Sequence, residues 1–175
     1  MNPPAKLSDL LLALESPLDP DEHYARFDRQ TGAIVSVERR LVDAAEAGEP
    51  LTPQELPAWQ REEIEIAQAI ANDESDRFIA PPSPFDFHEY SEMERFIGTV
   101  TDAAHAEQLW RALKGRGAFG RFKHAAERLG LLEAWFEYRE TAMKEFVIAW
   151  AEAHEVAYID DSVPSRGGGT VRNDT

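Results

Sequence analysis

The sequence contains no cysteine. Disulfide bonds, thiolate metal sites and a cysteine nucleophile are therefore excluded. A chain without disulfides is compatible with a reducing compartment, and we expect a cytoplasmic protein. The sequence also lacks a G-x-x-x-x-G-K-[ST] phosphate loop and a Rossmann fingerprint, so we expect no cofactor.

Long apolar runs are missing as well. The apolar stretch near the N-terminus is short, is interrupted by Asp9 and Glu15, and lacks the basic start of a signal peptide. No window approaches an uninterrupted apolar run of about 18 residues, which a membrane-spanning helix needs. We therefore expect no contact with a membrane.

Positive charge is scarce. The chain has 18 lysines and arginines against 33 aspartates and glutamates, which gives a formal net charge of −15. Such a charge keeps a protein soluble and disfavours nonspecific binding to nucleic acid. An acidic surface can also mimic nucleic acid, but a solvated acidic surface explains the composition without that role.

The composition is that of a folded protein. The 175 residues are 43% hydrophobic and 10% aromatic, which suffices to bury a core of ordinary size. We predict a single globular domain over residues 1–161. The polar, glycine-rich residues 162–175 are predicted to form a disordered tail.

A short helix and a hairpin are predicted near the N-terminus. Leucines at helical spacing indicate a helix that begins near Leu7, with Ser8 as its N-cap. The runs Tyr24–Asp28 and Ala33–Val37 are rich in β-forming residues, and Gly32 between them suits the positive φ of a hairpin turn.

The rest of the chain is predicted to be mostly helical. Residues 58–72 form an amphipathic pattern with Trp59 on the inner face. Asp86 and Glu89 form a capping box that opens a helix, and Asp102 caps the next one. Further helices are expected from about Phe119 to Leu129 and from about Leu131 to Ala153, together with a short helix ending at Gly48.

These elements predict an α+β fold that is predominantly helical. It has about five or six helices and a small antiparallel sheet of about three strands, made of the N-terminal hairpin and the segment 77–80. The helical spacing of the aromatic residues predicts one continuous core of Trp110, Phe119, Phe122, Trp135, Phe146 and Trp150.

Five segments carry a resemblance: FDRQTGAIV, RFIAPP, FHEYSEMERFIGTV, GRGAFGRFKH and AWFEYRETAMKEFVIAWAEAHEV. Together they resemble one of the numbered uncharacterised protein families of bacteria, the UPF families, over roughly residues 7–158. The most specific segment matches the family signature G-[RK]-GAF-x-RFK. Gly120 stands where a basic residue is common in that family, and His124 stands where an aspartate is common. The resemblance implies a shared fold and no activity.

One segment reverses the charge of the chain. Residues 111–128 hold six lysines and arginines against Glu127 alone, a net charge of +5, so the remainder carries −20. A basic, glycine-containing turn that leads into a helix favours anions through free N–H groups, the helix dipole and nearby cations. Alternatively, the glycines only cap and pack helices, and the cations pair with acidic neighbours. The candidate anion or partner contacts are Lys114, Arg116, Arg121 and Lys123.

Catalytic and metal-binding patterns are weak. His88 and Glu92 have i,i+4 spacing, but no H-E-x-x-H or G-x-S-x-G motif is present. The adjacent carboxylates Asp160 and Asp161 do not offer the opposed environments of a catalytic pair. We therefore expect no metal site and rank an enzyme below the binding functions.

The sequence favours a soluble, non-catalytic protein-binding or adaptor module in the bacterial cytoplasm, with an unknown protein partner. The alternative is a module that binds an anionic ligand or RNA through the basic segment 111–128. Salt-sensitive binding of nucleic acid would distinguish the second function from the first.

Overall fold

The computed structural model describes residues 1–51 and 56–162. Helices hold more than half of these residues, which confirms the α+β, predominantly helical fold. Among the described residues there are seven helices of 8 or more residues and the one-turn helix α4. The elements are β1 (Ala5–Lys6), α1 (Leu7–Glu15), β2 (His23–Asp28), β3 (Ala33–Glu38), α2 (Arg39–Glu46), α3 (Ala58–Ala71), β4 (Phe78–Ile79), α4 (Pro84–Phe87), α5 (Glu89–Thr99), α6 (Ala103–Ala112), α7 (Ala118–Arg128), α8 (Leu132–Ala153) and β5 (Tyr158–Ile159).

The antiparallel sheet has the strand order β3-β2-β4, which confirms the predicted hairpin and third strand. The hairpin turn needs glycine because Gly32 has a φ of +69°, and an added Cβ would lie 2.6 Å from the carbonyl oxygen of Pro3. β3 pairs with the whole of β2, whereas β4 pairs only with Phe27 and Asp28. One edge of β2 therefore stays largely open.

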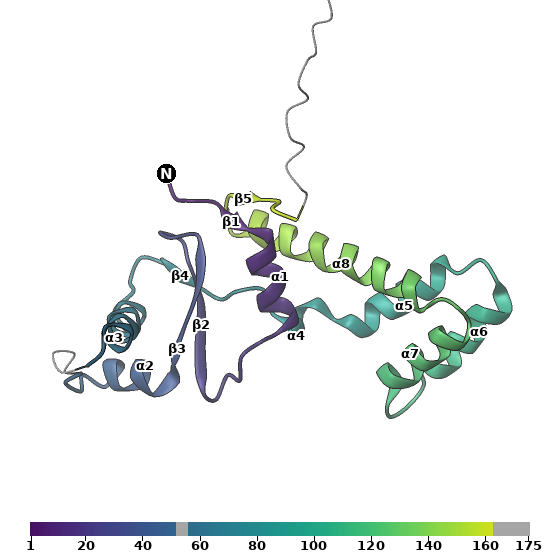
Figure 1. The fold of residues 1–175 in the computed structure, drawn as a ribbon, viewed down its shortest axis with the longest axis horizontal. Coiled ribbons are helices and arrows are strands. Elements are labelled where there is room, and N and C mark those ends of the chain that lie inside the picture. The colour runs from purple at the N-terminus through teal and green to yellow at the C-terminus, as the bar shows by residue number, and fades with distance from the viewer. Residues whose placement is uncertain (52–55, 163–175) are drawn as a thin grey trace, which may run out of the picture.

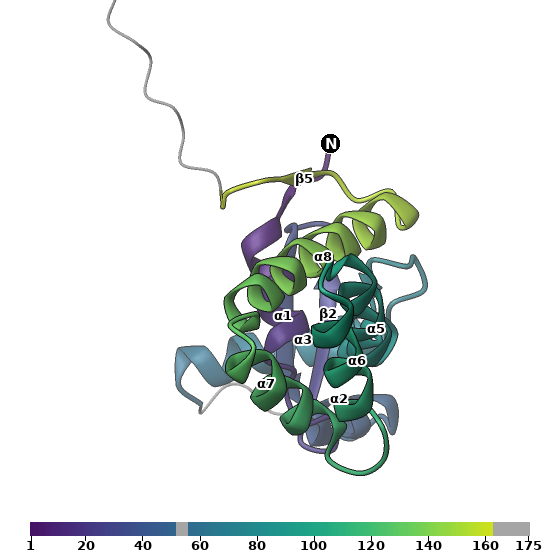
Figure 2. The same ribbon diagram turned by 90° about the vertical axis from the view of Figure 1, so that its right-hand side faces the viewer.

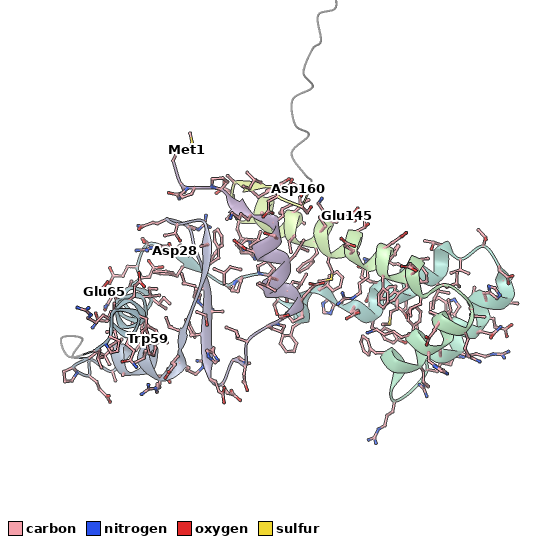
Figure 3. All side chains as sticks on the ribbon, viewed as in Figure 1. Met1, Asp28, Trp59, Glu65, Glu145 and Asp160 are labelled. Carbon is pink, nitrogen blue, oxygen red and sulfur yellow. The ribbon has the colours of Figure 1, made fainter. Side chains whose placement is uncertain are left out.

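A buried ion pair ties β2 to the start of β4. Arg77 donates from Nε and Nη2 to the two carboxylate oxygens of Asp28, each at 2.8 Å. Asp28 is only 2% exposed, and Figure 3 shows it beside the sheet. The hydrogen bonds from Arg77 hold the pKa of the Asp28 carboxyl below its usual value.

The two ends of the described chain lie together (Figure 1). β1 and β5 form a two-residue parallel pair, too short to leave a periodic pattern in the sequence. The prediction that Ser8 caps α1 is wrong, because α1 begins after Lys6. The backbone N–H and the hydroxyl of Ser8 both donate to the carboxylate of Asp161, which caps the helix from the other end of the chain.

The entry into α5 also differs from prediction. Asp86 and Glu89 do not form the box that opens one long helix. Instead Ser83 caps α4 by accepting a backbone N–H, with Pro84 in the first turn. His88 then takes a φ of +52°, which separates α4 from α5. Asp102, by contrast, caps α6 as predicted.

The prediction of one continuous aromatic core is wrong. Phe122 and Trp135 are buried together, whereas Phe146 and Trp150 pack against a different cluster. The 22-residue helix α8, drawn across the front of Figure 2, contributes to both clusters, with Trp135 in the first and Met143 in the second. The described residues form three buried clusters, which we call the helical core (Met93, Phe96, Ile97, Leu109, Leu113, Ala118, Phe122, Ala125, Ala126 and Trp135), the central core (Ala5, Leu7, Leu10, Leu14, Phe27, Phe87, Met143, Val147 and Ala151) and the α3 core (Val37, Val42 and Ala67).

The α3 core lies where α2 and α3 cover β3, at one end of the molecule (Figure 1). The expectation that Trp59 is buried there is wrong, since its side chain is 61% exposed on the first turn of α3 (Figure 3). Ile64 and Ala67, later in the helix, are the buried residues. The apolar pattern therefore located the helix but not the part of it that packs.

The C-terminal boundary is visible only in part. Lys144 on α8 pairs with Asp160 and donates to the hydroxyl of Ser162 at 3.3 Å. The remainder of the predicted tail, residues 163–175, lies outside the described residues. None of the helices within 1–51 and 56–162 is long and apolar enough to cross a membrane.

Candidate functional site

The basic segment 111–128 forms a helical hairpin of α6 and α7. The turn between them depends on Gly115 and Gly117, whose φ angles of +80° and +70° suit glycine. Gly117 is also the N-cap of α7 and offers no side chain to its first turn. The hairpin lies at the end of the molecule opposite α2 and α3 (Figure 1).

The four predicted contact residues are all exposed, namely Lys114, Arg116, Arg121 and Lys123. Across the described ranges, no carboxylate lies within 4.0 Å of their charged nitrogens. Arg111, at the start of the segment, differs because it pairs with Glu107 one turn earlier on α6. Pairing with acidic neighbours therefore does not account for the four cations.

Arg121 has a structural contact that its charge does not reveal. Its guanidinium donates to the carbonyl oxygens of Ala112 and Lys114, which close the end of α6. Basic side chains commonly satisfy such terminal carbonyls. The donors of Arg121 are thus partly used within the hairpin, whereas Lys114, Arg116 and Lys123 have none of their side-chain nitrogens bound within the described part of the chain.

Two aromatic residues of the hairpin were expected in the core, and that expectation is wrong. Trp110 is 42% exposed and Phe119 is 45% exposed. Their neighbours Leu109 and Phe122 occupy the inner positions and are fully buried. In the sequence, the apolar stripe of each helix is wide enough to include the exposed residue and the buried one. Only the packing of α6 and α7 against α5 and α8 decides which of them is buried.

A groove of about 960 Å³ lies between α1 and β2. The connection Ser16–Pro20 and the segment Ala80–Phe85 contribute to its walls. Three large apolar side chains of the groove are exposed, namely Leu12, Leu18 and Phe85, the last at 82%. Exposed apolar surface gathered around one hollow is typical of a binding surface.

The open edge of β2 forms part of this groove. Antiparallel strands direct the N–H and C=O of alternate residues to the same neighbour. The bond from the Arg29 N–H to the Arg77 carbonyl, at 3.0 Å, shows that odd-numbered residues face the β4 side. Ala25 therefore directs its N–H away from β3, and no described residue accepts a hydrogen bond from it.

The open edge was not predicted, although the sequence contains a signal for it. Pro81 and Pro82 follow β4 after a single residue, Ala80. Proline has no N–H and cannot continue a ladder, so a short strand ending in prolines leaves a longer neighbour unpaired. The six-residue β2 beside the two-residue β4 is that case.

Two arginines sit at the strand side of the groove. The guanidiniums of Arg26 and Arg39 lie 4.0 and 5.1 Å from the ring centroid of Tyr24. Asp9 and Asp19 also line the groove. Arg26 donates to the Ala25 carbonyl and the Tyr24 hydroxyl, and Arg39 donates from Nε to the Pro20 carbonyl. Neither has a carboxylate within 4.0 Å in the described part of the chain, so their remaining donors can meet an acidic group of a partner.

A smaller hollow of about 400 Å³ lies between α5 and α8. It contains Glu92, which is 9% exposed and pairs with Arg95 at 2.5 Å. Burial raises the pKa of Tyr138 in the same hollow. The Glu92 carboxylate already has its cationic partner, and Glu145 also lines the hollow.

We also searched for groups of side chains that could hold a metal ion. Within residues 1–51 and 56–162, no three histidine, aspartate or glutamate side chains come close enough together to do so. The paired carboxylates at the end of the chain serve packing, since Asp160 pairs with Lys144 and Asp161 binds Ser8.

Comparison with known proteins identifies one family. Residues 55–165 match the model of UPF0158, an uncharacterised protein family. The match includes the GRGAFGRFK segment and excludes the hairpin of β2 and β3, so it begins later than the resemblance predicted from the sequence. No curated protein and no solved structure matches the chain. Because the match spans more than half of its length, the chain belongs to the uncharacterised protein family UPF0158.

Proposed function

We propose that this protein is a non-catalytic module that binds an extended segment of a partner protein in the groove between α1 and β2. The observation that carries the proposal is the unpaired edge of β2 along the groove. An extended peptide can add to such an edge, with main-chain hydrogen bonds giving affinity and side-chain pockets giving specificity. The function is binding in the cytoplasm, not chemistry.

Backbone pairing supports this mode of binding. The Ala25 N–H is a free donor on the groove side, and the next odd residue, Phe27, already pairs with Ile79 of β4. A partner strand in line with β4 would continue the ladder past the point where Pro81 ends it. The spacing between the strands would be the usual value of about 4.8 Å.

The groove's side chains indicate which segment would fit. Leu12 and Phe85 offer apolar contacts, whereas Arg26 and Arg39 offer charge-assisted hydrogen bonds to a carboxylate. Side chains of an extended strand alternate between its two faces. We therefore expect a segment with apolar residues at alternate positions and an acidic residue near the arginines.

The decisive variant is Ala25→Pro. Proline removes the outward N–H and leaves the β2–β3 bonds intact, because Ala25 does not use its N–H toward β3. Ser36→Pro is the matched control, since Ser36 stands opposite Ala25 on β3 and its N–H faces the other edge of the sheet. Both variants place a proline within a strand of the same hairpin.

The probe is a displayed library of random linear peptides, selected on the full chain. Enriched peptides should bind the wild-type protein and Ser36→Pro equally, and should bind Ala25→Pro at least about tenfold more weakly, the loss of one or two main-chain hydrogen bonds. Leu12→Glu should weaken the binding of the same peptides. Equal binding to Ala25→Pro, or no peptide enriched on the wild-type protein, would refute the proposal.

A further inference from the structure

The basic hairpin of α6 and α7 forms a second surface with its own chemistry. We propose that it binds single-stranded nucleic acid, with phosphate groups on Lys114, Arg116 and Lys123 and a base stacked on Phe119. This inference goes beyond the protein-binding groove and does not depend on it, because the two surfaces lie on different elements.

The charge of the hairpin is the first observation. Residues 111–128 carry +5, and the three lysine and arginine side chains named above are exposed with no carboxylate within 4.0 Å in the described ranges. At physiological salt the Debye length is about 8 Å, so acidic side chains on elements distant from the hairpin are largely screened. A phosphate group near the turn therefore meets a locally positive surface.

The exposed rings are the second observation, independent of the charge. Phe119 is 45% exposed and stands four residues before Lys123 on α7. On a helix that spacing places the ring and the ammonium on the same flank. Trp110, near the end of α6, is 42% exposed as well, and Lys114 follows in the turn after this helix.

An exposed aromatic ring beside a cation favours single-stranded nucleic acid over other anionic ligands. Surfaces that bind single strands combine cations along the backbone with aromatic side chains on which bases stack. Bases of a duplex are already stacked on one another and are not available to Phe119. An acidic protein surface would use the cations, whereas a nucleic-acid base can also stack on the exposed ring beside them.

The hairpin is held in place beneath this surface. Phe122, three residues after Phe119, is fully buried against Trp135 and Phe96. Arg121 closes the turn through the carbonyls that end α6. A surface that is ordered before binding loses less conformational entropy when the ligand arrives.

The test measures binding of labelled oligonucleotides to the full chain by fluorescence anisotropy. The probes are oligo-uridine RNA, oligo-thymidine DNA and a duplex DNA, each with unlabelled poly-glutamate as an acidic-polypeptide competitor. Both single strands should bind more tightly than the duplex, and poly-glutamate should compete poorly. Three phosphate contacts predict a slope of log Kobs against log salt of about −2 for a single strand.

The variants separate stacking from charge. Phe119→Ala should weaken single-strand binding by about tenfold, within the range for one base stacked on an aromatic ring. Arg116→Glu combined with Lys123→Glu should abolish it. The controls are Trp59→Ala, whose ring is 61% exposed, and the double change Lys6→Glu with Arg61→Glu. Like Arg116 and Lys123, Lys6 and Arg61 are exposed and have no carboxylate within 4.0 Å in the described ranges, so these variants alter ring count and net charge by the same amounts on other elements.

Several outcomes would overturn the proposal. These are absence of salt-dependent binding to either single strand, duplex or poly-glutamate binding of equal strength, and unchanged binding by Phe119→Ala. Equal loss in the control variants would also overturn it, since charge or ring count alone would then explain the binding. Thermal melting of every variant checks that the fold is intact. Ala25→Pro should bind the oligonucleotides like the wild type, so failure of the groove function and failure of this one are distinguishable.

Discussion

The helical core and the central core are built in opposite ways. The helical core joins residues between Met93 and Trp135, so its partners are near one another along the chain. The central core joins Leu7 and Leu10 of α1 to Met143 and Val147 of α8, across most of the sequence. Contacts of the first kind can be read from helical periodicity, whereas contacts of the second kind cannot.

This difference extends to the two candidate surfaces. The basic hairpin rests on the helical core, and its residues were found from the sequence because they are contiguous. The groove borders the central core and takes walls from α1, β2 and the segment after β4, which meet only in the folded chain. Four substitutions test whether the two cores are independent, and they are taken in order of decreasing expected loss of stability.

The largest effect is expected from Phe122→Ala in the helical core. Phe122 is 0% exposed, and its ring packs against Phe96 and Trp135 at centroid distances of 6.2 and 5.2 Å. Removing it should lower the free energy of unfolding by about 3–5 kcal/mol. Chemical denaturation followed by tryptophan fluorescence measures the change. A loss below about 1 kcal/mol would show that the helical core repacks easily.

The second effect concerns the ion pair beside the central core. Asp28→Asn removes the charge that Arg77 binds and should lower the free energy of unfolding by about 3 kcal/mol at neutral pH. The folded-state pKa of Asp28 is lowered, so its stabilisation is complete above the unfolded value of about 3.9 and is lost as pH falls toward the folded value.

Denaturation of the wild type and Asp28→Asn at a series of pH values checks this sign. The two curves should approach each other as the pH falls below about 4, where the unfolded-state carboxyl takes up its proton, and should meet only below the lowered folded-state pKa of Asp28. A difference that stays constant down to low pH would mean that the substitution disturbs packing instead of removing a charge. Asp9→Asn, at an exposed position on α1, is the control and should change neither curve.

A smaller effect is expected where the two ends of the chain meet. Asp161→Ala removes the acceptor of both Ser8 hydrogen bonds and should lower the melting temperature slightly, because the contact is exposed. Hydrogen exchange should show faster opening of β1 and β5 and no change in the helical core. Faster exchange throughout α6 and α7 would instead show that the two cores unfold as one unit.

The smallest effect is expected from Phe119→Ala, which should leave thermal stability unchanged within error. Phe119 is on the same helix as Phe122 but is 45% exposed. Differential scanning calorimetry of both variants compares a surface and a core position of equal chemistry. A large loss of thermal stability in Phe119→Ala would mean that the ring packs in the core and is not available for stacking with a base.

Local elements of this protein could be predicted from the sequence because neighbouring residues determine them. The β2–β3 hairpin follows from two runs of β-forming residues and Gly32, and the start of α6 follows from Asp102. The basic segment was likewise visible as a contiguous run of charge. Each of these features involves residues that are close along the chain, and hydrogen bonding and periodicity act at that range.

The tertiary structure alone decided the rest. Whether Trp110, Phe119 and Trp59 are buried depends on which helix faces arrive against them, and one apolar stripe is compatible with several answers. The cap of α1 came from Asp161, at a separation no local rule describes. The open edge of β2 required the length of β4 and the course of the chain after it. These outcomes are set by packing between distant segments, and the free energy of that packing belongs to no single stretch of sequence.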